Sequence, residues 1–137
     1  MLTIEEKTQR NWAMAAHLAA LAICFVAIPL GNIWGPLIVW LWKRHEVPGV
    51  DEHGKAALNF HISIVLYLLI GAIVLGVPLL ILTFVPFLGL LTIPLLWLMG
   101  VVGSLIILVE IILTIIAAVK ASDGSTFNYP LSLKLIK

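Results

Sequence analysis

Residues 56–109 read AALNFHISIVLYLLIGAIVLGVPLLILTFVPFLGLLTIPLLWLMGVVGSLIILV, 54 positions without an Asp, Glu, Lys or Arg. A helix that crosses a bilayer needs about 20 apolar residues, so this stretch and the ten residues after it have room for two crossings. A β-barrel would need apolar and polar residues to alternate, and the segment LIILV at 105–109 does not alternate. The stretch therefore predicts two long transmembrane helices.

The composition of the whole chain agrees with this prediction. Of the 137 residues, 62% are hydrophobic and 11% are charged, whereas an ordinary soluble domain is about half apolar and about a quarter charged. A disordered chain would be polar and highly charged. Eight basic and seven acidic residues are too sparse and too balanced for a nucleic-acid-binding surface. We therefore expect a small integral membrane protein that lipid surrounds and that has no nucleic-acid partner.

A second charge-free run, residues 11–42, is divided by Pro29, Gly31 and Asn32. Residues 12–28 would form a helix of about 25 Å, which is marginal for a crossing, and residues 33–42 a half-helix of about 15 Å. This half-helix is tilted, re-entrant or interfacial. The predicted fold is an all-α membrane bundle of two hairpins in a single transmembrane domain, residues 1–137. Its helices are 12–28, 33–42, 52–82 and 95–120, followed by a tail at 121–137.

The distribution of Lys and Arg predicts the sides of the membrane, because cytoplasmic loops carry an excess of these residues. They fall in the N-terminal head, the middle loop and the tail, whereas the turn at 83–94 has none. We therefore expect a multi-pass protein of the bacterial inner membrane with both termini in the cytoplasm. The rival topology, three spans with the head outside, leaves Lys7 and Arg10 on the unfavourable side.

Several polar residues interrupt the apolar stretches, and an ionisable group at membrane depth is a functional candidate by default. Glu110 is the clearest case, since it lies about 15 Å along a helix from Lys120. The predicted intramembrane polar cluster consists of Glu110, His61, Asn59, Ser63, Tyr67 and His17. Two readings stay open. In one, Glu110 is a neutral acid that clamps helices together through Tyr67 or Ser63. In the other, it serves a proton-linked or substrate-contacting role.

The sequence carries no motif of an enzyme, such as a phosphate-binding loop or a nucleophile elbow. The histidines and Glu110 have the chemistry of metal ligands but lack a diagnostic spacing. We therefore expect no catalytic residues, no metal site and no cofactor.

Three segments resemble a known family: IPLGNIWGPLIVWL at 28–41, VDEHGKAALNFH at 50–61, and AAVKA at 117–121 with YPL at 129–131. Together they resemble a family of small bacterial membrane proteins that is similar to the twenty-kilodalton Tic component of chloroplast inner-envelope protein import. The chain departs from that family at His61, where glutamine is expected, and in its long apolar stretch around 84–97. The resemblance implies four helical membrane segments with both ends on one side and, for the plastid relatives, a role in a protein-conducting complex.

Two hypotheses for the function follow. In the first, the chain is a scaffold or a component of a protein-translocation or assembly complex, with copies of itself or other membrane proteins as partners. Its docking element would be the cytoplasmic loop motif of Asp51, Glu52, His53, Gly54 and Lys55. In the second, the intramembrane cluster forms a proton-linked transporter of a small solute or ion.

Overall fold

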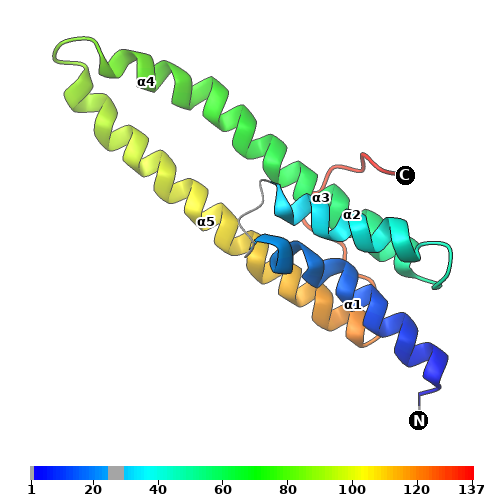
Figure 1. Cartoon of the computed structure of the whole chain (residues 1–137). Helices are drawn as coiled ribbons and strands as arrows, with labels where there is room; N and C mark the ends of the chain where they lie inside the picture. The colour runs from blue at the N-terminus through cyan, green and yellow to red at the C-terminus, as the bar shows by residue number, and fades with distance from the viewer. Residues whose placement is uncertain (1, 25–29) are drawn as a thin grey trace. The chain divides into compact units, whose positions relative to one another are not determined.

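The computed structural model describes residues 2–24 and 30–137, without the side chains of residues 23 and 24. Its helical elements are α1 (Ile4–Cys24), α2 (Gly31–Lys43), α3 (Val50–Gly71), the π-helical turn η1 (Ala72–Gly76), α4 (Val77–Thr83) and α5 (Gly89–Ser122) (Figure 1). Because α3, η1 and α4 follow one another directly, they form one helical segment, and the described residues contain no strand. The predicted all-α fold of four helical segments is confirmed.

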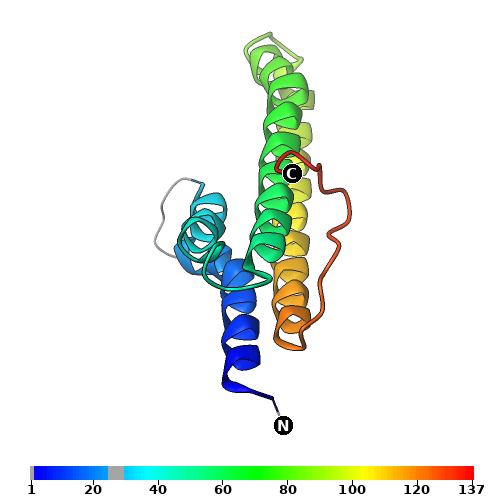
Figure 2. The ribbon, with the colours of Figure 1, turned by 90° about the vertical axis from the view of Figure 1, so that its right-hand side faces the viewer.

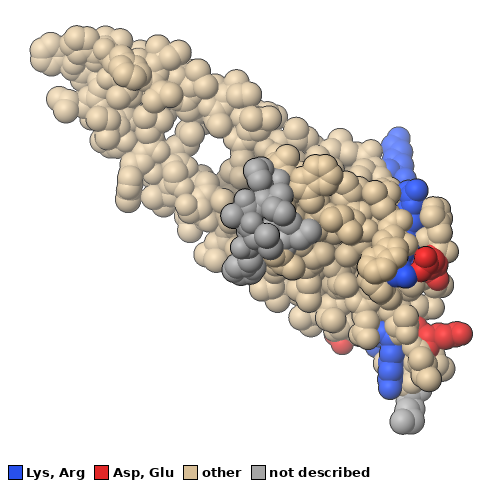
Figure 3. Space-filling view, in the orientation of Figure 1, with Lys and Arg blue, Asp and Glu red and all other residues tan. Residues whose placement is uncertain are grey.

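The chain divides into two compact units. Unit 1 comprises Met1–Ser63 and Ile111–Lys137, and unit 2 is Ile64–Glu110. By sequence, unit 1 holds every charged residue except Glu110. On the face drawn in Figure 3, the Lys, Arg, Asp and Glu side chains accordingly gather over the helices of unit 1. The two units therefore differ in chemistry: one is polar at its surface and the other is almost free of charge.

Helix α1 begins at Ile4 rather than at the predicted Trp12. The reason is a capping box: the Thr3 backbone N–H donates to Glu6 Oε2 at 2.8 Å, and the Glu6 N–H donates to Thr3 Oγ1 at 3.1 Å. The backbone hydrogen bond from Thr3 also lowers the pKa of Glu6. The predicted end of this helix at residue 28 lies outside the described residues.

Small residues hold the helices of unit 1 close together. A Cβ added to Gly35 on α2 would lie 2.0 Å from the backbone oxygen of Ala19 on α1. A Cβ added to Gly54 on α3 would lie 2.5 Å from the ring of Trp40 on α2. The buried apolar core is rich in alanine: Ala13, Ala16, Ala20, Ala57, Ala117, Ala118 and Ala121. Such residues let helix backbones approach closely, which is how helices associate where lipid removes the hydrophobic driving force.

Unit 2 is a helical hairpin with a loosened first arm. Gly71, Gly76 and Pro78 predict a kink in this arm, and the structure has the π-helical turn η1 at this place. The Val77 N–H reaches back five residues to the Ala72 carbonyl. Because Pro78 has no N–H to donate, an irregular turn here costs the helix little.

The turn of the hairpin is shorter than predicted. Helix α4 ends at Thr83 and α5 begins at Gly89, so Pro94, which we expected in the turn, lies inside α5. The hydroxyl groups of Thr83 and Thr92 are 2.9 Å apart and join the two arms. A Cβ on Gly89 would lie 2.5 Å from the Thr83 carbonyl oxygen, so this close reversal requires glycine. Because the connection is short, α5 begins at Gly89, before the predicted start at residue 95 that follows Pro94.

The apolar side chains of unit 2 face outward. Phe84 and Phe87 in the turn are 82% and 88% exposed, and Trp97 on α5 is 73% exposed. Two helical stretches, Val50–Leu82 and Gly89–Ser122, are long and apolar enough to cross a membrane. Helix α2, with 13 residues, is about 20 Å long, shorter than the hydrocarbon core of a bilayer. A large exposed apolar surface of this kind belongs in lipid.

Candidate functional site

The C-terminal tail, residues 123–137, is anchored in unit 1 by side chains of α3. Asn59 donates from Nδ2 to the Ile136 carbonyl at 3.0 Å. Its Oδ1 accepts from the N–H groups of Leu135 at 3.1 Å and Ile136 at 2.8 Å. Ser63, one helical turn further along, accepts the N–H of Leu133 at 2.8 Å and donates to the Asn59 carbonyl. In Figures 1 and 2 the tail turns back from the end of α5 to run beside α3.

These contacts give two members of the predicted polar cluster a definite role. Asn59 and Ser63 do lie on one face of α3, as the i, i+4 spacing indicates. Their polar groups, however, pair with the tail backbone, to which they supply partners much as a neighbouring strand would. We refer to these two residues as the tail clamp.

A buried hydrogen-bonded chain of rings links the tail to α1 and α3. The Tyr129 hydroxyl lies 3.0 Å from His17 Nδ1, and His17 Nε2 lies 3.1 Å from His53 Nδ1. Phe60 stacks on the Tyr129 ring with centroids 4.1 Å apart. A neutral His17 satisfies both contacts, because one ring nitrogen donates and the other accepts. If both histidines were positively charged, two N–H groups would face one another, so this pair carries at most one positive charge.

His17 is fully buried and lies on α1, whose described residues are not among the two stretches found to be long and apolar enough to cross a membrane. Burial, together with smaller effects of charge repulsion from His53 and His61, lowers the pKa of His17 to about 3. At neutral pH the imidazole is therefore uncharged. This ring chain is a structural link that acid would disturb.

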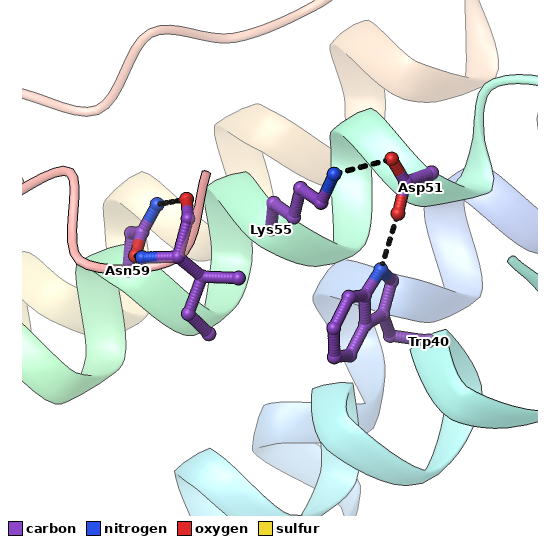
Figure 4. Close-up of polar contacts among 5 residues, drawn as sticks. Trp40, Asp51, Lys55 and Asn59 are labelled. Carbon is purple, nitrogen blue, oxygen red and sulfur yellow. Dashed lines mark hydrogen bonds and ion pairs between the residues drawn. The ribbon is translucent and has the colours of Figure 1, made fainter.

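The loop motif at the start of α3 is built around Asp51. Its Oδ1 accepts the Trp40 indole N–H at 2.8 Å, and its Oδ2 accepts Lys55 Nζ at 2.6 Å (Figure 4). Gly54 lies against Trp40, whereas Glu52 is exposed. These contacts fix α2 against the first turns of α3.

A pocket of about 540 Å³ opens between α3 and the tail. Its polar lining includes Glu52, His53, Asn59, Asn128 and Lys134. His53 is the residue that connects this pocket to the buried ring chain, because it lines the pocket and also contacts His17. The site of unit 1 can thus bind a polar group next to the tail clamp.

The remaining cluster residues fall in different units. His61 belongs to unit 1 and is fully buried. Tyr67 and Glu110 belong to unit 2, where Tyr67 is 39% exposed and Glu110 is 7% exposed. The convergence of all six residues on one cavity stays a prediction. Within the described ranges, no three His, Cys, Asp or Glu side chains gather as a metal-ligand group.

The N-terminal head and the end of α5 meet in unit 1. Arg10 Nη1 donates to the Ser122 carbonyl at 3.4 Å. A Cβ added to Gly124, which has a φ of +82°, would lie 3.0 Å from the Arg10 guanidinium. Arg10 of the head and the start of the tail are therefore neighbours.

A family model matches residues 8–136, nearly the whole chain. The chain belongs to the magnetosome magnetite crystal formation protein family, MamF/MmsF. Membership in a magnetosome family, together with two apolar helices of crossing length, identifies it as a membrane protein. Comparisons with curated proteins and with solved structures each found no match.

This result corrects the resemblance drawn from the three sequence segments. The likeness to the Tic-related family is wrong, since the match that covers the chain is to MamF/MmsF. Apolar helices broken by Gly and Pro, with a short charged loop between them, are features that small membrane proteins share whatever their role. The role in protein conduction rested on that resemblance and therefore has no support.

Sequence reasoning missed two residues of the site, Trp40 and Tyr129. In the sequence, Trp40 and Tyr129 were only parts of the segments at 28–41 and 129–131. A buried Tyr or Trp usually finds a hydrogen-bond partner, and this tendency was the available signal. The partners themselves are distant in the sequence: Tyr129 and His17 are 112 positions apart.

Proposed function

We propose that this chain acts in magnetite crystal formation as a membrane-embedded scaffold. It would assemble with copies of itself or with other membrane proteins, and unit 1 would be the part that these partners contact. The observation that carries the proposal is the family match over residues 8–136. Further support comes from unit 1, where Asn59 and Ser63 of α3 hold the tail and Asp51 ties α2 to α3.

The proposed topology has both termini and the middle loop on the cytoplasmic side. The contact of Arg10 with Ser122 supports it, because a head on the far side could not reach the end of α5. The concentration of Lys and Arg in unit 1 supports the same arrangement. The turn at residues 84–88, which has no charge, would lie on the opposite side.

A second candidate, the proton-linked transporter, is favoured by one observation. Glu110 is the one charged residue of unit 2 and is 7% exposed in an otherwise apolar part of α5. A carboxyl group at such a position costs free energy on insertion into a membrane, and residues of this kind usually have a role in structure or transport.

The two candidates are separated by complementation of a magnetosome-forming bacterium that has lost its own family member. Magnetite crystal size and shape are measured by electron microscopy after expression of the wild type, Asn59→Ala or Glu110→Gln. The scaffold predicts rescue by the wild type and by Glu110→Gln, and weakened rescue by the clamp variant. The transporter is favoured if Glu110→Gln fails to rescue crystal formation and also abolishes proton-coupled flux in liposomes. Failure of the wild type to change the crystals would refute the proposed function.

A further inference from the structure

A second pocket of unit 1, separate from the tail clamp, has a cationic lining. Its volume is about 380 Å³, within the range of small-ligand sites. It is lined by Trp40, Arg44, His45, Asp51, Lys55 and Lys137. Three of these side chains are formally positive and one is negative, so the lining favours an anion.

Arg44 is held in this pocket by an aromatic ring rather than by an acid. Its Cζ lies 4.5 Å from the centroid of the Trp40 ring. Its Nε is buried and has no acceptor within residues 2–24 and 30–137, and no ion pair within these residues joins its guanidinium to a carboxylate. The pKa of Asp51 is lowered mainly by its hydrogen bonds with Lys55 and Trp40 and, to a smaller extent, by the charge of Arg44. A stacked guanidinium keeps its planar fork of donors in place, and that fork matches phosphate geometry.

Lys55 adds a second positioned cation. Its Nζ lies 2.6 Å from Asp51 Oδ2, and Asp51 also accepts from the Trp40 indole, which fixes the carboxylate (Figure 4). An ammonium group has three donors, and this ion pair uses one of them. Asp51 therefore positions Lys55 without neutralising the pocket, since Arg44 and Lys137 remain.

The residues around the pocket are typical of the headgroup level of a bilayer. The pocket is formed at the end of the apolar helix α2, which carries the exposed Trp42 near that end, and by the first turns of α3. Tryptophan and basic residues at a helix end mark the headgroup level of a bilayer, and basic pockets beside membrane helices bind anionic headgroups. We propose that this pocket binds a phosphate group, supplied by an anionic lipid headgroup or by free phosphate.

The test uses the full chain in neutral detergent and native mass spectrometry. It is titrated with dihexanoyl phosphatidylglycerol, with dihexanoyl phosphatidylcholine and with inorganic phosphate. The variants are Arg44→Gln, Lys55→Gln and Asp51→Asn. Lys43→Gln is the matched control, because Lys43 is a cation of the same region that pairs with Glu46 and does not line the pocket.

We expect one phosphatidylglycerol to bind, about fivefold more weakly in Arg44→Gln and in Lys55→Gln, and unchanged in Lys43→Gln. Asp51→Asn removes a negative charge and should strengthen binding about fivefold, a gain that a poorly folded variant could not give. Inorganic phosphate that binds with the same variant pattern and displaces the lipid identifies free phosphate as the source. No binding of either anion, equal loss in Lys43→Gln, or weaker binding in Asp51→Asn overturns the proposal.

Discussion

The tail clamp makes a quantitative prediction about Asn59. Replacing Asn59 with Ala removes three hydrogen bonds to the tail, those with the Ile136 carbonyl and with the N–H groups of Leu135 and Ile136. Each such bond contributes about 1 kcal/mol net, so the docked tail should lose about 3 kcal/mol. That loss corresponds to an increase of roughly 100-fold in the population of the undocked tail.

Hydrogen–deuterium exchange measured by mass spectrometry reports this change directly. The amides of Leu135 and Ile136, which donate to Asn59, should exchange roughly 100-fold faster in Asn59→Ala, because exchange follows the open population. Ser63→Ala removes the one bond to Leu133 and should accelerate that amide by about fivefold. The matched control is Asn128→Ala, an exposed asparagine of the tail, which should leave the exchange unchanged. Equal protection of the tail in the wild type and in Asn59→Ala would refute the clamp.

Two further predictions concern the helices of unit 1. Gly35→Ala places a methyl group against the Ala19 carbonyl and should lower the free energy of unfolding in detergent by about 2 kcal/mol. The control is Gly100→Ala, whose methyl group meets no atom within 4 Å and should leave this free energy unchanged. Equal stability of the two variants would contradict the close packing of α1 and α2. The pKa of His17 is about 3 when folded, against an ordinary value of 6.5, so between these two pH values the unfolded chain binds a proton that the folded chain does not. The burial of His17 therefore costs no stability above pH 6.5. As the pH falls below 6.5, the equilibrium constant for unfolding should rise by up to tenfold per pH unit. The free energy of unfolding, measured with denaturant from pH 7 to pH 4.5, should depend less on pH in His17→Gln than in the wild type. The same pH dependence in both proteins would contradict a buried neutral imidazole.

The sequence was sufficient for the parts of the fold that depend on local pattern. The charge-free run at residues 56–109 indicates two long apolar helices because the number of apolar residues needed for a crossing is fixed by the bilayer. Gly76 and Pro78 indicate an irregular turn, since proline removes a helical donor. The early start of α1 was missed, although Thr3 and Glu6 have the spacing of a capping box.

The site was less predictable because its contacts join residues that are distant in sequence. The i, i+4 spacing placed Asn59 and Ser63 on one face of α3, but spacing does not reveal what covers a face. Their partner is the tail, more than 60 positions away. Likewise, a buried histidine on α1 gives no sign that His53 and Tyr129 will complete a chain of rings.

The central proposal is that the head, the middle loop and the tail lie on one side of the membrane and the turn at residues 84–88 lies on the other. Single cysteines at Thr8, His45, Ser125 and Phe87, in a Cys24→Ala background, can be labelled with a membrane-impermeant maleimide in sealed vesicles of defined orientation. The account predicts labelling of positions 8, 45 and 125 from the same side and of position 87 from the opposite side. Labelling of position 8 from the side opposite to position 125, or of all four positions from one side, would contradict it.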